Sequence, residues 1–436
     1  MGQRLKPANQ PKVGEWISDN IVTLIFVVFI IFGFAVSSGV SLNFFLNELM
    51  DRIFRNSFLV ISLIIPVIAG LGLNFGIVVG AMAGQIAIVI VRYFNLGGIS
   101  GLMLCFLIAL PLAMLFGYFT GRLYNKTRGQ EMIASLMVGY FANGLYQFLF
   151  LVAVGVIIKV PKNHPLIKPD GIGVRMTVDL VPVADGGLKY ALSNIWKIPF
   201  MWAVIVVAVG ILALLFFRIM SQKKHKITTT KGQQISTGVN VVACIAVILY
   251  SIFAIVTKAP ITKVKEVPVI TGLLIVGFCV FTELLLKTKL GQDFKSVGQS
   301  QHISEVSGIN VDRTRIIAVM ISTVLAAWGM IIYLQDMGTL NTYNAHTNIG
   351  MFAVASILVG GASTSKANIK NALIGVVLFN AMFIMSPEIG QAVFGQALLG
   401  EYFRTFMAYG VIGAALGLYV WKANKKGVQT LDTADE

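Results

Sequence analysis

Aromatic and amide side chains gather in residues 140–147, inside an apolar run of the sequence. Tyr140, Phe141 and Tyr146 supply ring faces, and Asn143 and Gln147 supply amide groups. Ring faces stack on an organic solute while amides hydrogen-bond to it, so this combination could bind a polar molecule. Ordinary hydrogen bonding between helices explains the same residues equally well.

Two more amides lie at the depth of apolar runs. Asn74 precedes a glycine-rich stretch and Gln85 follows it. Polar groups at such a depth are costly unless they are bonded internally or line a wet cavity. The candidates for a solute pathway are therefore Asn74, Gln85, Tyr140, Asn143 and Gln147. Helix packing is the competing interpretation.

Few ionisable residues accompany these amides, which limits the chemistry of the chain. Glu131 and Glu283 lie near the ends of apolar runs, and Glu283 has Lys287 four residues on, as in a helical ion pair. The four histidines lack a second ligand at metal spacing. The sequence also has no G-x-x-x-x-G-K-[ST] phosphate loop and no credible nucleophile–base grouping. We expect no metal site, no cofactor and no catalysis on this chain alone.

The composition is that of an integral membrane protein. Hydrophobic residues make up 56% of the 436 residues and charged residues only 12%, against about a quarter in soluble proteins. Long apolar runs without alternation favour helices over a barrel. Lys and Arg, which give a net charge of +15, fall mostly in the short gaps between these runs, where they set topology. We expect the lipid bilayer, and no nucleic acid, as a partner.

The predicted fold class is an all-α polytopic membrane protein of about 10–12 membrane segments, with glycine-rich packing helices and half-helices. The candidate spans are residues 21–40, 58–73, 75–91, 98–120, 132–158, 200–217, 239–256, 269–286, 316–334, 349–361, 372–385 and 399–421. The two spans at 349–361 and 372–385 are short and could instead be half-helices or a re-entrant pair. The first span follows a basic stretch without an A-x-A-like cleavage site, so we expect it to be uncleaved, with the N-terminus inside.

Glycines recur at helical spacing within the predicted spans. Gly76, Gly80 and Gly84 form a doubled small-xxx-small ridge that lets a second helix approach closely. The pairs at 117 and 121 and at 413 and 417 repeat this spacing, and we interpret them as helix contacts as well.

The whole chain, residues 1–436, is predicted to form one transmembrane domain, and the remaining segments connect its spans. Residues 159–198 are rich in Pro, Gly and Asp and are predicted to form an extracytoplasmic loop. Residues 41–57 mix apolar and charged positions, which indicates either an interfacial helix or a polar extension of the next span. Residues 287–315 form the longest polar interruption in the second half of the chain and are expected on the cytoplasmic side.

Within that interruption, "GQSQHISEVSGINVDRTR" predicts a short helix. Its core is residues 303–306, Gly298 and Gly308 bound it, and Ser300 or Ser304 could cap it. A short helix between two spans is suited to fit the groove of a partner and to pass on the partner's motion. A solvated loop is the competing interpretation of the segment.

The segment at 285–322 resembles the permease subunits of ATP-binding-cassette (ABC) importers for simple sugars, of the ribose and galactoside type. "NIGMFAVASILVGGAS" at 348–363 and "GLNFGIVVGAMAGQ" at 72–85 are similar to further segments of that family. "QEMIASLMVGYFANG" at 130–144 is similar to its nucleoside-type relatives. The residues at 303–305 depart from the family's acidic-alanine pair, and residues 199–265 add one helical hairpin to its usual pattern.

The resemblance implies an ABC permease in the cytoplasmic membrane, working with a second permease copy or paralogue, ATPase subunits that hold the ATP, and an extracytoplasmic solute-binding protein. The residues implied to couple to the ATPase are Gly298, Gln299, Ser300, Ser304, Glu305 and Gly308. The cargo implied is a simple sugar, with a nucleoside as the alternative. An ion-coupled secondary transporter is the competing class, and it requires a buried acidic residue that the sequence does not supply.

Overall fold

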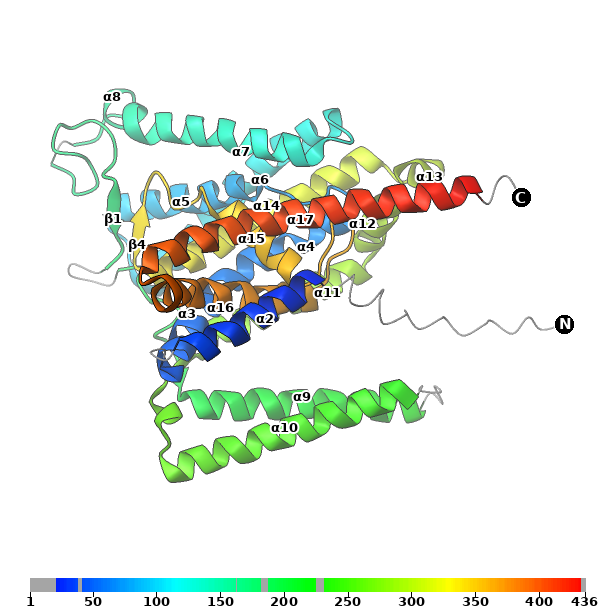
Figure 1. Ribbon diagram of the computed structural model, residues 1–436. Helices are drawn as coiled ribbons and strands as arrows, with labels where there is room; N and C mark the ends of the chain where they lie inside the picture. Colours follow the sequence, from blue (N-terminus) through cyan, green and yellow to red (C-terminus); the bar gives the residue numbers. More distant parts are fainter. Residues whose placement is uncertain (1–20, 38–40, 162, 182–186, 225–230, 433–436) are drawn as a thin grey trace. The chain divides into compact units, whose positions relative to one another are not determined.

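The computed structural model describes residues 21–37, 41–161, 163–181, 187–224 and 231–432, and almost all regular structure in them is helical (Figure 1). The helices are α2 (Ile21–Val36), α3 (Leu42–Ser62), α4 (Ile64–Ile68), α5 (Ile77–Tyr93), α6 (Gly98–Lys126), α7 (Glu131–Phe148), the π-helix η1 (Leu149–Ala153), α8 (Val154–Val156), α9 (Phe200–Lys224), α10 (Lys231–Thr257), the 3-10 helix η2 (Pro260–Lys263), α11 (Val269–Lys287), α12 (Lys289–Gln299), α13 (Gln301–Val306), α14 (Val311–Met337), α15 (Ile349–Val359), α16 (Ile369–Phe394) and α17 (Ala397–Asp432). Four short strands, β1 (Thr177–Asp179), β2 (Lys197–Ile198), β3 (Val267–Pro268) and β4 (Thr339–Asn341), form two antiparallel pairs, β1 with β4 and β2 with β3.

Seven of the described helical segments are long and apolar enough to cross a membrane, and three shorter apolar helices accompany them. The long ones are Gly98–Lys126, Glu131–Val156, Phe200–Gln222, Thr237–Thr257, Val269–Lys287, Val311–Met337 and Ile369–Phe394. The prediction of an all-α polytopic membrane protein is therefore confirmed. The basic stretch before the first span lies outside the described residues.

The second predicted span, 58–73, is wrong as a single crossing. Its first residues belong to α3, which runs unbroken from Leu42 to Ser62, so of the two alternatives for residues 41–57 the structure has the polar extension of the following helix. Pro66 lies in the next short helix, α4, and has no backbone N–H to extend a hydrogen-bond ladder. Gly70 and Gly72 then adopt positive φ angles of 75° and 69°, which turn the chain away from the helix.

The two short spans near the C-terminus have different outcomes. α15 has 11 residues and is too short to cross, as expected. α16 has 26 residues and is long enough to cross, although the sequence predicted only residues 372–385. The prediction ended early because Pro387 and Glu388 follow the apolar run. Pro387 lies inside α16, so the helix continues past both residues.

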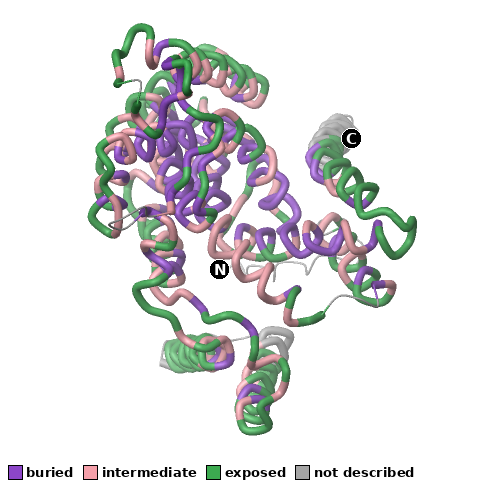
Figure 2. Tube along the Cα trace, turned by 90° about the vertical axis from the view of Figure 1, so that its left-hand side faces the viewer, coloured by how far each residue is buried: buried purple, intermediate pink, exposed green. Residues whose placement is uncertain are grey.

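Helix α14 packs against α5 and α6 through glycines. A Cβ atom at Gly80 would lie 2.5 Å from the carbonyl oxygen of Thr323, and one at Gly84 would lie 2.5 Å from that of Ala327. On α6, Gly117 faces the backbone of Met320 in the same way. Gly76 instead faces the Tyr124 hydroxyl, at the start of the ridge. Figure 2 shows buried positions concentrated along the packed helices, with long exposed stretches elsewhere.

One predicted glycine contact, that of residues 413 and 417, is not made with the part of the chain that the structure describes. A Cβ atom at Gly413 or Gly417 would meet nothing within 4 Å, although the spacing of the pair matches that of Gly117 and Gly121. The spacing shows which face of a helix carries small residues. It does not report what, if anything, covers that face.

The chain divides into two compact units. One comprises residues 40–50 and 192–273, and the other comprises the rest. In the smaller unit, α9 and α10 lie side by side (Figure 1). The β2–β3 pair closes their base, with Lys197 opposite Pro268 and Ile198 opposite Val267. The range 199–265, expected to be an added hairpin, thus contains α9, α10 and η2. Residues 225–230, between the two helices, lie outside the described residues.

Replacing Gly80 with Leu should destabilise the protein. The new side chain must push α14 away from α5, because it meets a backbone carbonyl that cannot rotate aside. Overpacking of this kind costs about 1–3 kcal/mol or more. We expect Gly80→Leu to lower the thermal unfolding temperature in detergent and to broaden the size-exclusion peak. Gly277→Leu is the matched control, because a Cβ atom there meets nothing within 4 Å. Wild-type behaviour of Gly80→Leu would contradict the described packing.

Candidate functional site

The polar interruption at 287–315 folds into α12, α13 and the first turn of α14. Each helix begins at a side chain that accepts a backbone N–H. Thr288 caps α12, Ser300 caps α13 by accepting from the Ile303 N–H at 3.3 Å, and Asn310 caps α14 by accepting from the Arg313 N–H at 2.9 Å. Three caps in about twenty residues fix where the chain turns between these helices.

Glycine and serine hold α13 in place from the inside. Gly308 ends α13 with a positive φ of 80°, as a C′ glycine does. Ser304 is fully buried, and its hydroxyl donates to the Ser300 carbonyl at 2.8 Å and lies 2.9 Å from the Ser296 hydroxyl. Gly298 packs against the backbone of Ile68, at the end of α4, where a Cβ atom would clash. These residues support the segment from within.

The outward surface of α13 is apolar at its tip. The side chains of Ile303 and Val306 are 64% and 78% exposed. Gln299 and Glu305 are exposed beside them. Sequence reasoning named Glu305 and Gln299 as coupling residues but gave Ile303 and Val306 only a place in the helix core. The spacing of three residues between two apolar side chains in a polar helix could have identified them.

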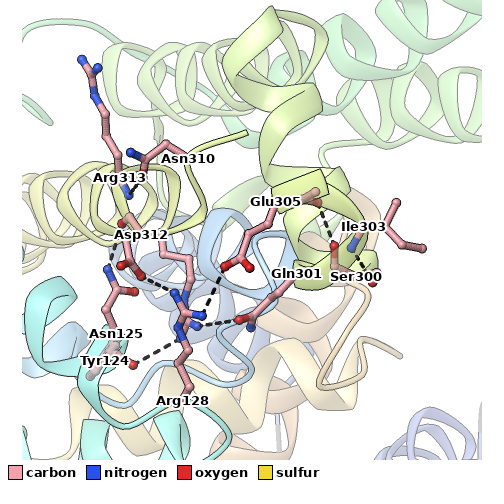
Figure 3. Close-up of polar contacts among 12 residues, drawn as sticks. Tyr124, Asn125, Arg128, Ser300, Gln301, Ile303, Glu305, Asn310, Asp312 and Arg313 are labelled. Carbon is pink, nitrogen blue, oxygen red and sulfur yellow. Dashed lines mark hydrogen bonds and ion pairs between the residues drawn. The ribbon is translucent and has the colours of Figure 1, made fainter. Parts of the chain in front are cut away.

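Arg128, in the turn between α6 and α7, forms ion pairs with α13 and with the first turn of α14 (Figure 3). Its guanidinium lies 2.6 Å from the Asp312 carboxylate and 3.4 Å from that of Glu305. The Asp312 carboxylate, the larger influence, raises the pKa of Arg128 above its ordinary value, and Glu305 adds to the shift. Asn125 also donates to the backbone carbonyl of Asp312 at 2.9 Å. The three ionic side chains are all more than two-fifths exposed, so they orient the segment more than they stabilise it.

A buried ion pair lies below this surface, and sequence reasoning missed it. Arg315, in the first part of α14, is fully buried, and its guanidinium lies 2.5 Å from the Glu131 carboxylate. The same guanidinium donates to Gln301 at 3.2 Å and to the backbone carbonyl of Tyr124 at 3.4 Å. Arg315 therefore connects α13, α14, α6 and the start of α7. The partners are 184 residues apart, so no local pattern could pair them.

A second polar cluster centres on His346, in the connection between β4 and α15. Its Nδ1 lies 2.8 Å from the Gln85 side-chain oxygen, and its Nε2 lies 2.8 Å from the Asn143 side-chain oxygen. A neutral imidazole donates from one nitrogen only. Turning the Gln85 amide over places its nitrogen, which has no other partner, against the second ring nitrogen. The Tyr146 ring packs edge-on against His346 with centroids 4.7 Å apart.

The predicted pathway residues separate into two groups. Gln85, Asn143 and Gln147 come together at His346, with Gln147 donating to Asn143 at 3.4 Å. Tyr140 is 69% exposed, and it lines a cavity of about 90 Å³ together with Asn143 and His346.

Asn74 lies apart from this cluster. Its side-chain oxygen accepts from the Gly76 N–H at 2.9 Å and from the Tyr124 hydroxyl at 2.8 Å. Those bonds secure the turn that leads into α5. The sequence gives no sign of the role of His346, because its partners are 261 and 203 residues away.

At the end of α14 remote from α13, two predicted outer segments meet. β1 lies within the loop 159–198, and β4 follows α14 directly. They pair with Thr177 opposite Asn341, Val178 opposite Leu340 and Asp179 opposite Thr339. The Tyr343 hydroxyl adds a bond to the Val174 carbonyl at 2.5 Å. Residues 162 and 182–186 of this loop lie outside the described residues.

This helical membrane architecture agrees with a family comparison. Residues 176–416, more than half of the chain, match the family described as branched-chain amino acid transport system / permease component. The chain belongs to that family and is a multi-pass membrane protein. The resemblance drawn from the residues is therefore confirmed at the level of the family.

Three curated relatives share parts of the chain. It is 28% identical to the xylose transport system permease protein of Haemophilus influenzae, over 41% of this chain and 46% of the relative. It is 31% identical to a probable ABC transporter permease protein of Escherichia coli, over 26% of this chain and 34% of the relative. It is also 31% identical to the nucleoside ABC transporter permease protein of Lactococcus lactis, over 20% of this chain and 25% of the relative. The chain thus spans less than half the length of each of these relatives. No solved structure matches it significantly.

The Arg315–Glu131 pair should be required for stability. Glu131→Gln leaves a fully buried guanidinium without its counter-charge, a loss that typically costs about 3–5 kcal/mol. We expect a clearly lower thermal unfolding temperature in detergent. Glu283→Gln is the control, because its partner Lys287 lies 3.3 Å away with both side chains more than half exposed, and such pairs contribute about 0–1 kcal/mol. Equal unfolding temperatures for the two variants would refute the structural role of the buried pair.

Proposed function

We propose that this chain is the membrane-spanning permease subunit of an ATP-driven ABC importer for a simple sugar in the cytoplasmic membrane. The observation that carries the proposal is the segment 298–308, a short capped helix with an apolar tip and a base fixed to the ends of the spans. Family membership supports the permease role. ATP hydrolysis belongs to a separate subunit in this proposal.

The apolar tip is the surface we assign to the ATPase partner. Ile303 and Val306 are exposed on α13, and the polar side chains of Gln299 and Glu305 are exposed in the same segment. A buried apolar centre with a polar rim is the usual anatomy of a protein–protein interface. The predicted coupling residues then divide into two roles: Gln299 and Glu305 touch the partner, while Gly298, Ser300, Ser304 and Gly308 fix the helix.

Close contacts connect α13 to the membrane-spanning helices. Arg315 ties Gln301 of α13 to Glu131 at the start of α7, and Gly298 ties the end of α12 to the end of α4. A push on α13 therefore moves α14 and its neighbours as a unit, not as separate side chains. This is what alternating access requires, since an ATPase must bias one of two packed arrangements.

The cargo we propose is a simple sugar of the galactose, galactoside or ribose type, with a nucleoside as the second candidate. One relative is named for xylose and another for nucleosides. The cluster at Gln85, Asn143 and His346 offers amide and imidazole groups, which suit a neutral hydroxylated solute. An ion-coupled carrier is less well supported. Glu131 is a largely buried acid, but it is paired with Arg315.

The outer partner in this proposal is a solute-binding protein that docks on residues 159–198 and on the connection after α14. The β1–β4 pair joins these two segments into one surface. A second permease copy or paralogue completes the pathway, as in importers that this chain resembles.

The first experiment is co-purification of the tagged chain from its native membrane, with mass spectrometry of what accompanies it. We expect an ABC ATPase with the wild type and roughly a tenfold or greater loss of it with Val306→Asp, because a charge in an apolar interface centre removes a hot spot. Met176→Asp is the matched control: this side chain is 56% exposed in the outer loop. Reproducible absence of an ATPase from intact wild-type complexes would favour an ion-coupled carrier.

A second experiment tests the solute pathway. Asn143→Ala removes a partner of His346, and we expect reduced uptake of radiolabelled cargo into cells, with normal protein levels in the membrane. Met137→Ala is the control, because this side chain lies on the same helix and is 61% exposed. Unchanged uptake kinetics for Asn143→Ala would leave Asn143 a packing residue.

A further inference from the structure

We propose that the permease chain has its own binding site for the ring of its cargo, in a cavity separate from the His346 cluster. This cavity, of about 240 Å³, lies between α3, α14, α16 and the start of α15. Its size is just below the range of about 300–1,000 Å³ for sites that hold drug-sized ligands, which suits a smaller solute. The proposal rests on the proposed function for the identity of the cargo class.

The floor of the cavity is aromatic. Phe352 and Phe383 have ring centroids 5.1 Å apart in an edge-to-face arrangement, and Phe379 lies 5.6 Å from Phe383 and 6.0 Å from Phe352. Such a cluster presents both ring faces and ring edges. The C–H face of a sugar ring, or the flat face of a base, packs well against it.

Guanidinium groups lie over Phe383 and over Tyr333, another ring of the lining, and the guanidinium carbon of Arg404 lies 3.9 Å from the centre of Phe383. The guanidinium carbon of Arg52 lies 5.4 Å from the centre of Phe383, and that of Arg55 lies 5.5 Å from the centre of Tyr333. A guanidinium carries five N–H donors, so each of these side chains can donate to a ligand in addition to its partners in the protein. Both arginines come from one face of α3, three residues apart, and both line the cavity.

The charge around the cavity favours a neutral ligand. Asp336 lies 3.9 Å from the Arg55 guanidinium, with both side chains largely buried. Asp336 does not line the cavity, but it supplies a counter-charge to Arg55. The amides of Asn344 and Asn348 in the lining offer acceptors as well as donors. Hydroxyl groups donate and accept at once, so they match such a lining, whereas a phosphate only accepts.

Amides complete the polar lining. Asn56 donates to the Asn380 side chain at 2.9 Å, and Asn380 donates to the Val376 carbonyl at 2.7 Å, so these two are held in fixed orientations. Asn344 and Asn348 are exposed where they line the cavity. Asn348 occupies the N-cap position of α15 but makes no capping hydrogen bond with its side chain. That amide is thus free to face a ligand.

The cavity also has a direct structural relation to the His346 cluster. Asn344, Asn348 and Phe352 line the cavity, Asn344 from the turn before α15 and Asn348 and Phe352 from the start of that helix. His346 and Gly350 line the small cavity beside Asn143. The chain from 344 to 352 is therefore the wall between the two cavities. A small rotation of α15 would move solute-contacting groups on both sides together.

The test is binding to the purified chain without any partner subunit, by equilibrium dialysis with radiolabelled D-galactose, D-ribose, D-xylose, uridine and ribose 5-phosphate. We expect at least one of the neutral solutes to bind saturably. Phe383→Leu and Asn348→Ala should each weaken this binding roughly three- to tenfold, the usual effect of losing one stacking or hydrogen-bonding partner. Phe119→Leu is the control, an exposed phenylalanine on α6 outside the cavity.

Three results would overturn the proposal. The first is no binding of any neutral solute at high millimolar concentration, and the second is binding that Phe383→Leu and Asn348→Ala leave unchanged in folded protein. The third is tighter binding of ribose 5-phosphate than of ribose, which would refute the proposal that the ligand is neutral. This binding assay needs no ATPase. If no solute binds but an ATPase does co-purify with the chain, the proposed binding site is refuted and the proposed function is not affected.

Discussion

The close approach of α14 to α5 and α6 is the constraint on which the rest of the structure depends. In a bilayer there is no hydrophobic force between helices, so association rests on packing and internal hydrogen bonds. Gly80 and Gly84 on α5 and Gly117 on α6 let the backbones meet. The most apolar window of α14 is 61% buried, against 17% for α9 and 11% for α10. In the proposed importer, a helix packed this closely would pass a displacement at one end on to the other, because its neighbours leave it little room to bend.

Much of the polar segment could be predicted because its structure is local. Ser300 caps α13, and Gly308 ends it, within the range of a single helical turn on each side. The glycine ridge could be predicted for the same reason, since spacing along one helix is visible in the sequence. The fold class followed from the apolar runs, which the bilayer forces into helices. Errors in this part arose where Pro66 broke a run and where α16 continued past a polar stretch.

The contacts that organise the candidate sites could not be predicted, because they join distant residues. Glu131 and Arg315 are 184 residues apart, and Gln85 and His346 are 261 apart. Each of these side chains alone is compatible with a solvated loop or a helix end. Only the packing of α14 against α6, and of the residue 346 connection against α5, brings the members together. The same holds for the cavity between α3 and α16, whose arginines, amides and phenylalanines come from four separate elements.

The short β2–β3 pair has a consequence for how the gene could change. Lys197 and Pro268 face each other across two antiparallel strands, whose partner Cα atoms lie about 4.5–5.5 Å apart. The two ends of the segment 198–267 therefore lie next to each other in space. A segment whose ends meet can be gained, lost or exchanged without lengthening or shortening the rest, and because it contains two membrane-length helices, the orientation of every later span is preserved. The hairpin of α9 and α10 is thus a natural cassette for recombination.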